Sequence, residues 1–331
     1  MPSMIETKTN GGIIQPKVDK IKFKSLAVLA LIVLLSLEGK AVLDAMQRSL
    51  HLCAGTIIPA LFPYLAASEL LVSSGAGERL ARKISAPIRA LFGISPCGAV
   101  VYFMGLLCGF PVGASMAAAY VRRGKLSRQE QEHLLCFCNV PSAAFVVNAV
   151  GVSLYGNLAL GWRLWGISLI SAALVGVGYR CLFHRRSAEM PRETAPEPIG
   201  LSPRDGNPIS RAAMGMLSVV STVLFFGALL GALHAAIQRV VPMEGGALAN
   251  LSALLSAVLE MSSGVCAIAA LPQVHSVVRC AAALGWGGWS VQYQLLSASG
   301  GTITRRGKIG FLIARLAQAA LCATGAWLWI L

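Results

Sequence analysis

The stretch that decides the fold is Gly105-Leu-Leu-Cys-Gly-Phe-Pro-Val-Gly-Ala114, which interrupts an apolar segment running from Cys97 to Tyr120. Glycine permits tight backbone geometry, and proline ends a helix and frees a carbonyl. The neighbouring loops 75–96 and 121–133 are both basic, and basic loops stay on the cytoplasmic side of a membrane. A hairpin that enters and leaves on the same side satisfies both loops. We therefore expect 97–120 to be a re-entrant hairpin, with a kinked span as the alternative.

The composition around this stretch is that of a membrane protein. Of 331 residues, 56% are apolar and 13% are charged, whereas a soluble domain is about 25% charged. The mean hydropathy is +0.68. Several apolar stretches approach the roughly 20 residues that cross about 30 Å of hydrocarbon. The sequence therefore predicts an all-α, polytopic integral membrane protein of about eight transmembrane or re-entrant helices.

The net charge of +14 is explained by loop charges that orient membrane helices. No segment is long enough to form a soluble domain with a basic face, so we expect a lipid bilayer and no nucleic acid as partner. We expect a cytoplasmic basic tail (1–24), a first membrane half (25–183), a polar loop (184–211) and a second membrane half (212–331).

The first apolar run, 25–37, is expected to continue towards Ala45 as a membrane helix. A cleaved signal peptide is the alternative, but no small-x-small cleavage site follows the run. The other expected spans are Leu52–Ser74, Leu134–Tyr155, Leu160–Phe183, Ala212–Ile237, Leu251–Leu271 and Phe311–Leu331.

A second break lies at the corresponding place in the second half. Trp286-Gly-Gly-Trp289 interrupts the apolar stretch 277–296, which lies between Arg279 and the basic loop 303–308. We expect each half to hold one broken or re-entrant element, 97–120 and 277–296, which is typical of a transporter whose site lies between interrupted helices. The alternative is that small residues simply let helices pack closely.

Two carboxylates, Glu69 and Glu260, lie inside apolar spans, one in each half. An ionised group at mid-membrane costs about 2.5–3.5 kcal/mol on the insertion scale, so a role in proton or cation coupling is expected. The alternative is structural, a carboxylate that accepts N–H bonds from a broken helix end. Asn139 and Ser142 either line a cavity or bond to a neighbouring helix. Arg315, near a span end, either snorkels or pairs with an anion.

Several motifs of catalysis are missing. The sequence has no G-x-x-x-x-G-K-[ST] phosphate loop, no H-E-x-x-H and no G-x-S-x-G. The nine cysteines are mostly inside apolar stretches, which argues against a disulfide framework. Cys136 and Cys138 form a lone C-x-C pair, which is weak evidence for a metal. We therefore expect no enzyme activity, no cofactor and no bound metal.

Motifs along the chain resemble those of the YlbJ-type sporulation integral membrane proteins. Gly105–Ala114 resembles the family's Ser-Gly-Tyr-Pro-x-Gly-Ala, and Leu259–Gly264 resembles its Glu-Ile-Thr-x-Gly. Trp286–Gln294 resembles Trp-Ser-Gly-Leu-Ser-Val-His-x-Gln, and Ile313–Leu316 resembles the closing Ala-Arg-Leu-Leu-His. The matches occur in the family's order from about Leu52 to the C-terminus. Glutamines 292 and 318 stand where the family has histidine, so a histidine proton relay is not expected.

The resemblance implies a function. The family is grouped with Gate or nucleoside-recognition membrane domains, related to parts of nucleoside transporters and of the ferrous-iron transporter FeoB. In endospore-forming bacteria it is needed to move dipicolinic acid from the mother cell into the forespore. The implied function is transport of a small organic anion, dipicolinate, by a multi-pass protein of the cell membrane or outer forespore membrane. A nucleoside or other small-metabolite transporter and a non-transporting scaffold in spore formation are the alternatives, and homo-oligomerisation stays open.

The expected mechanism is alternating access around a midplane site. The two breaks, 109–113 and 286–289, would form its walls, and the glutamates would bind a coupling cation or order the broken helices. Helix N-termini and an arginine suit a dianion. The candidate residues for binding the substrate or a coupling ion are Glu69, Gly109, Pro111, Gly113, Asn139, Glu260, Ser262, Trp286, Ser290, Gln292 and Arg315.

Overall fold

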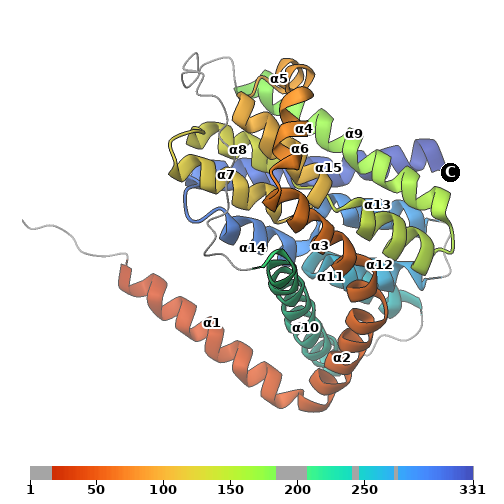
Figure 1. The fold of residues 1–331 in the computed structure, drawn as a ribbon. Helices are drawn as coiled ribbons and strands as arrows, with labels where there is room; N and C mark the ends of the chain where they lie inside the picture. Colours follow the sequence, from red (N-terminus) through yellow and green to blue (C-terminus); the bar gives the residue numbers. More distant parts are fainter. Residues whose placement is uncertain (1–16, 184–206, 241–245, 272–274, 331) are drawn as a thin grey trace, which may run out of the picture.

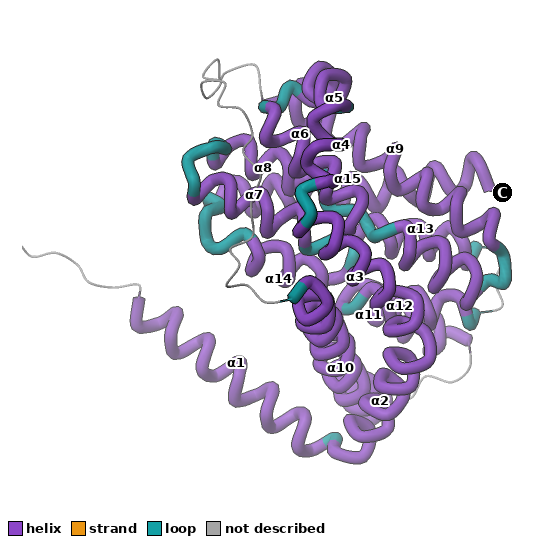
Figure 2. Tube along the Cα trace, viewed as in Figure 1, coloured by secondary structure: helices purple, strands orange, loops and turns teal. Residues whose placement is uncertain are grey.

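The computed structural model describes residues 17–183, 207–240, 246–271 and 275–330, and these contain helices and no strand (Figure 1 and Figure 2). The first half contains α1 (Lys17–Leu37), α2 (Gly39–Leu52), the π-helix η1 (Cys53–Ile57), α3 (Ile58–Ser73), α4 (Ala76–Lys83), α5 (Ser85–Phe92), α6 (Pro96–Cys108), α7 (Val112–Arg122), α8 (Arg128–Phe137), the π-helix η2 (Ala144–Leu154) and α9 (Leu158–Phe183). The second half contains α10 (Pro208–Val240), α11 (Gly246–Leu259), α12 (Met261–Ala269), α13 (Ser276–Trp286), α14 (Gly288–Ala298) and α15 (Arg305–Ile330). The all-α prediction is confirmed.

Within the described residues, four helical segments are long and apolar enough to cross a membrane. They are Gly39–Ser73, Leu158–Leu182, Pro208–Val240 and Arg305–Trp329. The pair α5 and α6, bent by 101°, makes a fifth if it is counted as one span. The expected count of about eight is not confirmed, because the other apolar segments are divided into helices too short to span on their own.

The first helix does not continue to Ala45, and that expectation is wrong. The chain turns sharply after Leu37, and α1 leaves the body of the protein at an angle to α2 (Figure 1). The segment from Gly39 then runs through η1 and α3 as one long helix to Ser73. The turn is held by the buried carboxylate of Glu38, whose Oε1 lies 3.0 Å from Nη1 of Arg239. Pairing satisfies a charge that burial would otherwise penalise.

Two segment boundaries also differ from expectation. Helix α1 begins at Lys17, inside the expected tail 1–24, and α10 begins at Pro208, inside the expected loop 184–211. Proline suits this position, because the first turn of a helix leaves its N–H groups unpaired. Residues 1–16 and 184–206, which make up most of that tail and loop, lie outside the described residues.

Helices α6 and α7 form a hairpin whose tip is Gly109–Pro111. Gly109 ends α6 with a φ of 73°, a left-handed conformation that favours glycine. The Phe110–Pro111 peptide bond is cis, and α7 begins at Val112. The two arms touch through glycines, since a Cβ added to Gly113 would lie 3.2 Å from the Cα of Gly105. The chain therefore reverses direction at the stretch that the sequence predicted to break.

Helices α11 and α12 form a second hairpin, where we expected a simple span over Leu251–Leu271. The turn is made by one extended residue, Glu260, with φ −140° and ψ 121°. Helix α12 then packs back along α11 so closely that a Cβ on Gly264 would overlap the backbone of Ala257. The hairpin of the second half thus lies at 246–269 and not at 277–296.

The close approach at Gly264 gives a stability prediction. Gly264→Ala is expected to destabilise the protein by about 1–3 kcal/mol, because the added methyl group forces the hairpin arms apart. Thermal unfolding of the purified protein in detergent measures the effect. Gly215→Ala on α10 is the control, since a Cβ there meets nothing within 4 Å. A Gly264→Ala protein as stable as the control would contradict the tight hairpin.

Two further elements are broken helices that do not fold back. Helix α8 ends at Phe137 and η2 resumes at Ala144, while α13 ends at Trp286 and α14 resumes after Gly287, which has a φ of 80°. Helix α13 packs mainly on α15, and α14 packs on α7 and α11. The break expected at Trp286–Trp289 is therefore present, as a break between two consecutive helices.

The same order of elements occurs twice along the chain. A long helix, a hairpin, a broken helix and a second long helix appear as α2–α3, α6–α7, α8–η2 and α9, and again as α10, α11–α12, α13–α14 and α15. The contacts are reciprocal: α7 packs on α14 and α12 packs on η2, while α3 packs on η2 and α10 packs on α14. This arrangement brings both hairpin tips and both helix breaks towards the centre of the molecule.

Candidate solute-binding site

Each hairpin tip rests against the helix break that follows it in the chain. At the first tip, a Cβ on Gly109 would lie 3.0 Å from the Cβ of Ser142. At the second break, a Cβ on Gly288 would lie 2.8 Å from the backbone nitrogen of Met261. Both glycines have positive φ, and the close contacts leave no room for a side chain there. The tips are thereby held against the breaks by backbone contact.

The fully buried guanidinium of Arg315, on α15, joins the two broken helices. Its Nη1 donates to the carbonyl of Asn139 at 3.0 Å, just past the end of α8, and to Oε1 of Gln318 at 2.7 Å. Its Nε donates to the carbonyl of Trp286, the last residue of α13, at 3.3 Å. Helix C-termini carry unpaired carbonyls and a partial negative charge, which a cation stabilises.

The surroundings of Arg315 are polar as well as buried. Gln292, on α14, shares the carbonyl of Trp286 through its Nε2 at 3.5 Å. Among the described residues, several buried polar atoms here have no hydrogen-bond partner: Asn139 Oδ1, Gln292 Oε1, Arg315 Nη2 and Gln318 Nε2. Because buried polar groups are nearly always hydrogen-bonded, this concentration distinguishes the centre between the breaks from an ordinary apolar core.

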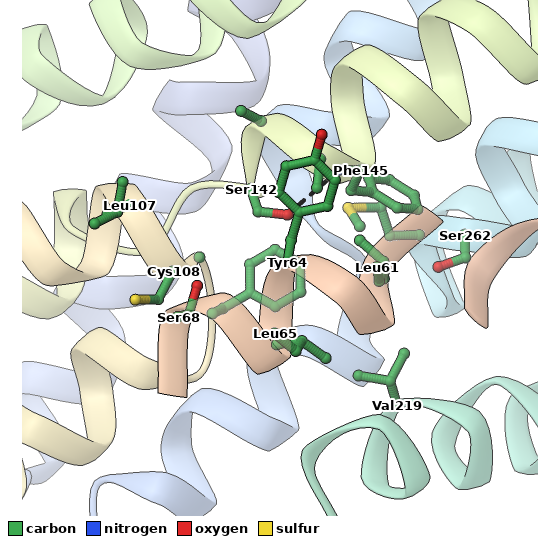
Figure 3. A pocket seen from close by; sticks show the side chains of 15 residues that line it. Leu61, Tyr64, Leu65, Ser68, Leu107, Cys108, Ser142, Phe145, Val219 and Ser262 are labelled. Atoms are coloured by element: carbon green, nitrogen blue, oxygen red, sulfur yellow. Dashed lines mark hydrogen bonds between the residues drawn. The ribbon is translucent and has the colours of Figure 1, made fainter. Parts of the chain in front are cut away.

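A cavity of about 200 Å³ lies at the first hairpin tip and the starts of η2 and α12 (Figure 3). Its walls come from α3, from the first hairpin tip, from the start of η2, from α10 and from the start of α12. The residues that line it are Leu61, Tyr64, Leu65, Ser68, Leu107, Cys108, Gly109, Phe110, Ser142, Ala143, Ala144, Phe145, Val219, Met261 and Ser262. The lining is mostly apolar and aromatic, with four hydroxyl groups.

Helices η2 and α12 begin at this cavity. Ser142 precedes η2, and its hydroxyl accepts from the backbone N–H of Phe145 at 3.3 Å, the bond drawn in Figure 3. Met261 and Ser262 form the start of α12. A helix N-terminus carries a partial positive charge and unpaired N–H groups, which bind anions. The cavity therefore combines apolar walls with hydroxyl groups and the N-terminus of η2, which suit a small anion.

Glu260 caps the N-terminus of α12. Its carboxylate accepts from the backbone N–H groups of Ser262 and Ser263, at 2.9 Å and 2.6 Å. The residue is buried and lies immediately behind Ser262 as seen from the cavity. Glu260 therefore accepts N–H bonds from a broken helix end, which is the structural alternative to a coupling role. A role of Glu260 in coupling stays a prediction.

Glu69 lies outside the cavity, although its neighbour Ser68 lines it. Its Oε2 accepts from Nε of Arg211 at 2.8 Å, an ion pair that joins α3 to α10. The pair is partly exposed, with 24% of the Glu69 side chain accessible. Glu69 is therefore part of a partly exposed ion pair, whereas Glu260 is a buried helix cap.

The structure groups the other predicted residues into two sets. Gly109 and Ser262 line the cavity, while Asn139, Trp286, Gln292 and Arg315 meet at the polar centre. The remaining three lie at helix starts: Pro111 and Gly113 at α7, and Ser290 in the first turn of α14. Sequence reasoning missed Tyr64, Phe110 and Phe145 as cavity residues, because aromatic side chains in apolar spans carry no local signal of a cavity.

No protein-family model, curated protein or solved structure matches the chain. Within the described residues, no group of three or more His, Cys, Asp or Glu side chains could hold a metal ion. The function is therefore inferred from the site and from the motifs quoted above.

Proposed function

We propose that this protein transports a small organic anion across a membrane, with dipicolinate as the substrate that the family resemblance implies. The cavity at the starts of η2 and α12 carries the proposal. Its volume of about 200 Å³ is below the roughly 300–1,000 Å³ of pockets for drug-sized ligands, which favours a small solute. Tyr64, Phe110 and Phe145 offer flat apolar contact to an aromatic ring. The N-terminus of η2 and the hydroxyl groups of the lining offer donors to a carboxylate, while Glu260 occupies the N-terminus of α12.

The order of elements supports a transporter with inverted repeats. In each half, the long helix, the broken helix and the second long helix would each cross the membrane once, and the hairpin would return to its own side. Since three crossings are odd, the second half would be inverted relative to the first. This topology places the loops α3–α6, α7–α8 and α14–α15 on one side, and all three are basic, with Arg82, Lys83, Arg122, Arg123, Arg305 and Arg306 at or beside them.

The mechanism we infer is alternating access between the two hairpins. The first tip touches its helix break through Gly109, without a side-chain hydrogen bond among those described. The second tip would also have to release the bond from Nε1 of Trp286 to the carbonyl of Val258, at 3.1 Å. Arg315 holds the two breaks together from behind and gives both hairpins a fixed support. Solute bound against η2 and α12 would then be exposed to one side of the membrane or the other, according to which hairpin has moved.

Uptake into proteoliposomes tests the proposal. Labelled dipicolinate is expected to enter saturably, with competition from other pyridine dicarboxylates and none from nucleosides. Ser142→Phe, which fills the cavity, is expected to reduce uptake by roughly tenfold or more. Ser153→Phe, at an exposed position of the same helix η2, is the control. Uptake of nucleosides alone would favour the nucleoside carrier, and no flux of either, with the protein correctly inserted, would favour the scaffold.

A further inference from the structure

A groove lies between α2, α10 and the α11–α12 hairpin. It consists of two cavities of about 440 and 410 Å³, here called the outer and inner cavities. They adjoin, since Arg48, Gly231, His234 and Ser252 line both. The outer cavity lies near the end of α10, which the proposed topology places on the side opposite the basic loops. The inner cavity extends towards the tip of the second hairpin.

The inner cavity is lined by a row of serines. Ser252 and Ser256, four residues apart, lie on one face of α11, and Ser263 faces them from α12. Hydroxyl groups at membrane depth face a packed neighbour or water, and here they face a cavity. The lining therefore favours a water-filled groove over a lipid-filled one.

The groove reaches the central cavity at Glu260. Ser263, which lines the groove, donates its N–H to Oε2 of Glu260, and Ser262, which lines the central cavity, donates to Oε1. The first turn of α12 is thus the partition between the two spaces. A movement of this hairpin tip would join them.

Among the described residues, Arg48 is the charged side chain that lines the inner cavity, while Asp44 lines the outer cavity alone. Arg48 lies nine residues after Gly39, which is about 14 Å along the helix at 1.5 Å per residue. An arginine at that depth is costly unless it faces a polar space or has a function. His234 approaches the same space from α10, with Nδ1 3.5 Å from the hydroxyl of Ser252.

We propose that this groove is the opening of the central cavity to the side opposite the basic loops, through which the anion enters or leaves. Arg48 is the residue that binds its carboxylate in this opening. The role of Arg48 rests on the proposed function, whereas the accessibility of the groove does not. The positive charge of Arg48 raises the local concentration of an anion, and the serines replace its hydration as it moves towards α12.

Cysteine labelling tests the groove without any transport assay. Ser256→Cys, in a protein with Cys181→Ser and Cys266→Ser, is expected to react with a membrane-impermeant thiol reagent only from the side opposite the basic loops. Ser153→Cys, exposed at the end of η2, reports that side, and Ser127→Cys reports the other. If Ser256→Cys stays unlabelled while Ser153→Cys reacts, the opening does not exist.

Transport kinetics test the role of Arg48 in binding the anion. Arg48→Gln is expected to raise the KM for dipicolinate supplied on the side opposite the basic loops roughly tenfold with little change in kcat, because the arginine acts on capture at that side. Arg163→Gln, an exposed arginine on α9, controls for loss of surface charge. An unchanged KM overturns the role of Arg48 even if the groove labels. If the wild-type protein moves no anion, the transport proposal fails, and labelling of Ser256→Cys still decides whether the groove exists.

Discussion

Replacing Arg315 by lysine is expected to destabilise the protein more than replacing it by leucine, and either change is expected to abolish transport. Lysine keeps a buried charge and its desolvation cost, but one ammonium cannot reach both helix breaks and Gln318. A hydrogen bond to a charged group contributes about 1.5–3 kcal/mol, and breaking a buried charged contact typically costs about 3–5 kcal/mol. Arg315→Lys should therefore lower the free energy of unfolding by about 3–5 kcal/mol.

Leucine loses the same hydrogen bonds but also removes the buried charge. The carbonyls of Asn139 and Trp286 are left without a donor, at a cost of about 1–3 kcal/mol each. The relief of desolvation, several kcal/mol for one ion, acts in the opposite direction. The net loss is therefore smaller than for lysine, even though leucine is the less conservative substitution.

Thermal unfolding of both variants in detergent, followed by uptake in proteoliposomes, checks this order. Arg163→Lys on the exposed face of α9 is the control, and its unfolding temperature should match the wild type. An Arg315→Lys protein that is as stable as the wild type would show that the guanidinium does not join the two breaks. Transport by either Arg315 variant at the wild-type rate would show that this junction is not required.

Arg315 also shows what the sequence could not define. The sequence places it near the start of a span beginning at Phe311, where it either snorkels or pairs with an anion, and its burial contradicts snorkelling. Helix α15 in fact begins at Arg305, so the basic residues of the loop 303–308 form its first turn. Arg315 is then well inside the helix and fully buried. Its role depends on α8 and α13, whose ends no local pattern brings together.

The two hairpins differ in how much of each the sequence predicted. The first was predicted because Gly and Pro mark its tip and basic loops flank it on both sides. The second has neither signal, and its turn is made by Glu260, whose carboxylate replaces the hydrogen bonds that the broken helix loses. The sequence identified Glu260 as an unusual residue and gave capping as one alternative. It could not show that the capped helix folds back.

Glu260→Gln is expected to reduce transport roughly tenfold or more and to destabilise the protein by about 1–2 kcal/mol. The carboxylate accepts one N–H with each oxygen, from Ser262 and Ser263. The glutamine amide has a single oxygen, so its NH₂ group would face a backbone N–H, donor against donor. A tip held in this way would be less ordered and would close the central cavity poorly.

Glu69→Gln is the matched comparison, because it makes the same chemical change in the other half of the protein. If Glu260 acts by capping α12, only Glu260→Gln loses uptake, while Glu69→Gln weakens a partly exposed ion pair with Arg211 and costs about 1 kcal/mol or less. If both glutamates bind a coupling ion, both variants lose uptake and the dependence of the rate on that ion. Wild-type uptake by Glu260→Gln would remove both roles, because neither capping through two oxygens nor cation binding survives the neutral amide.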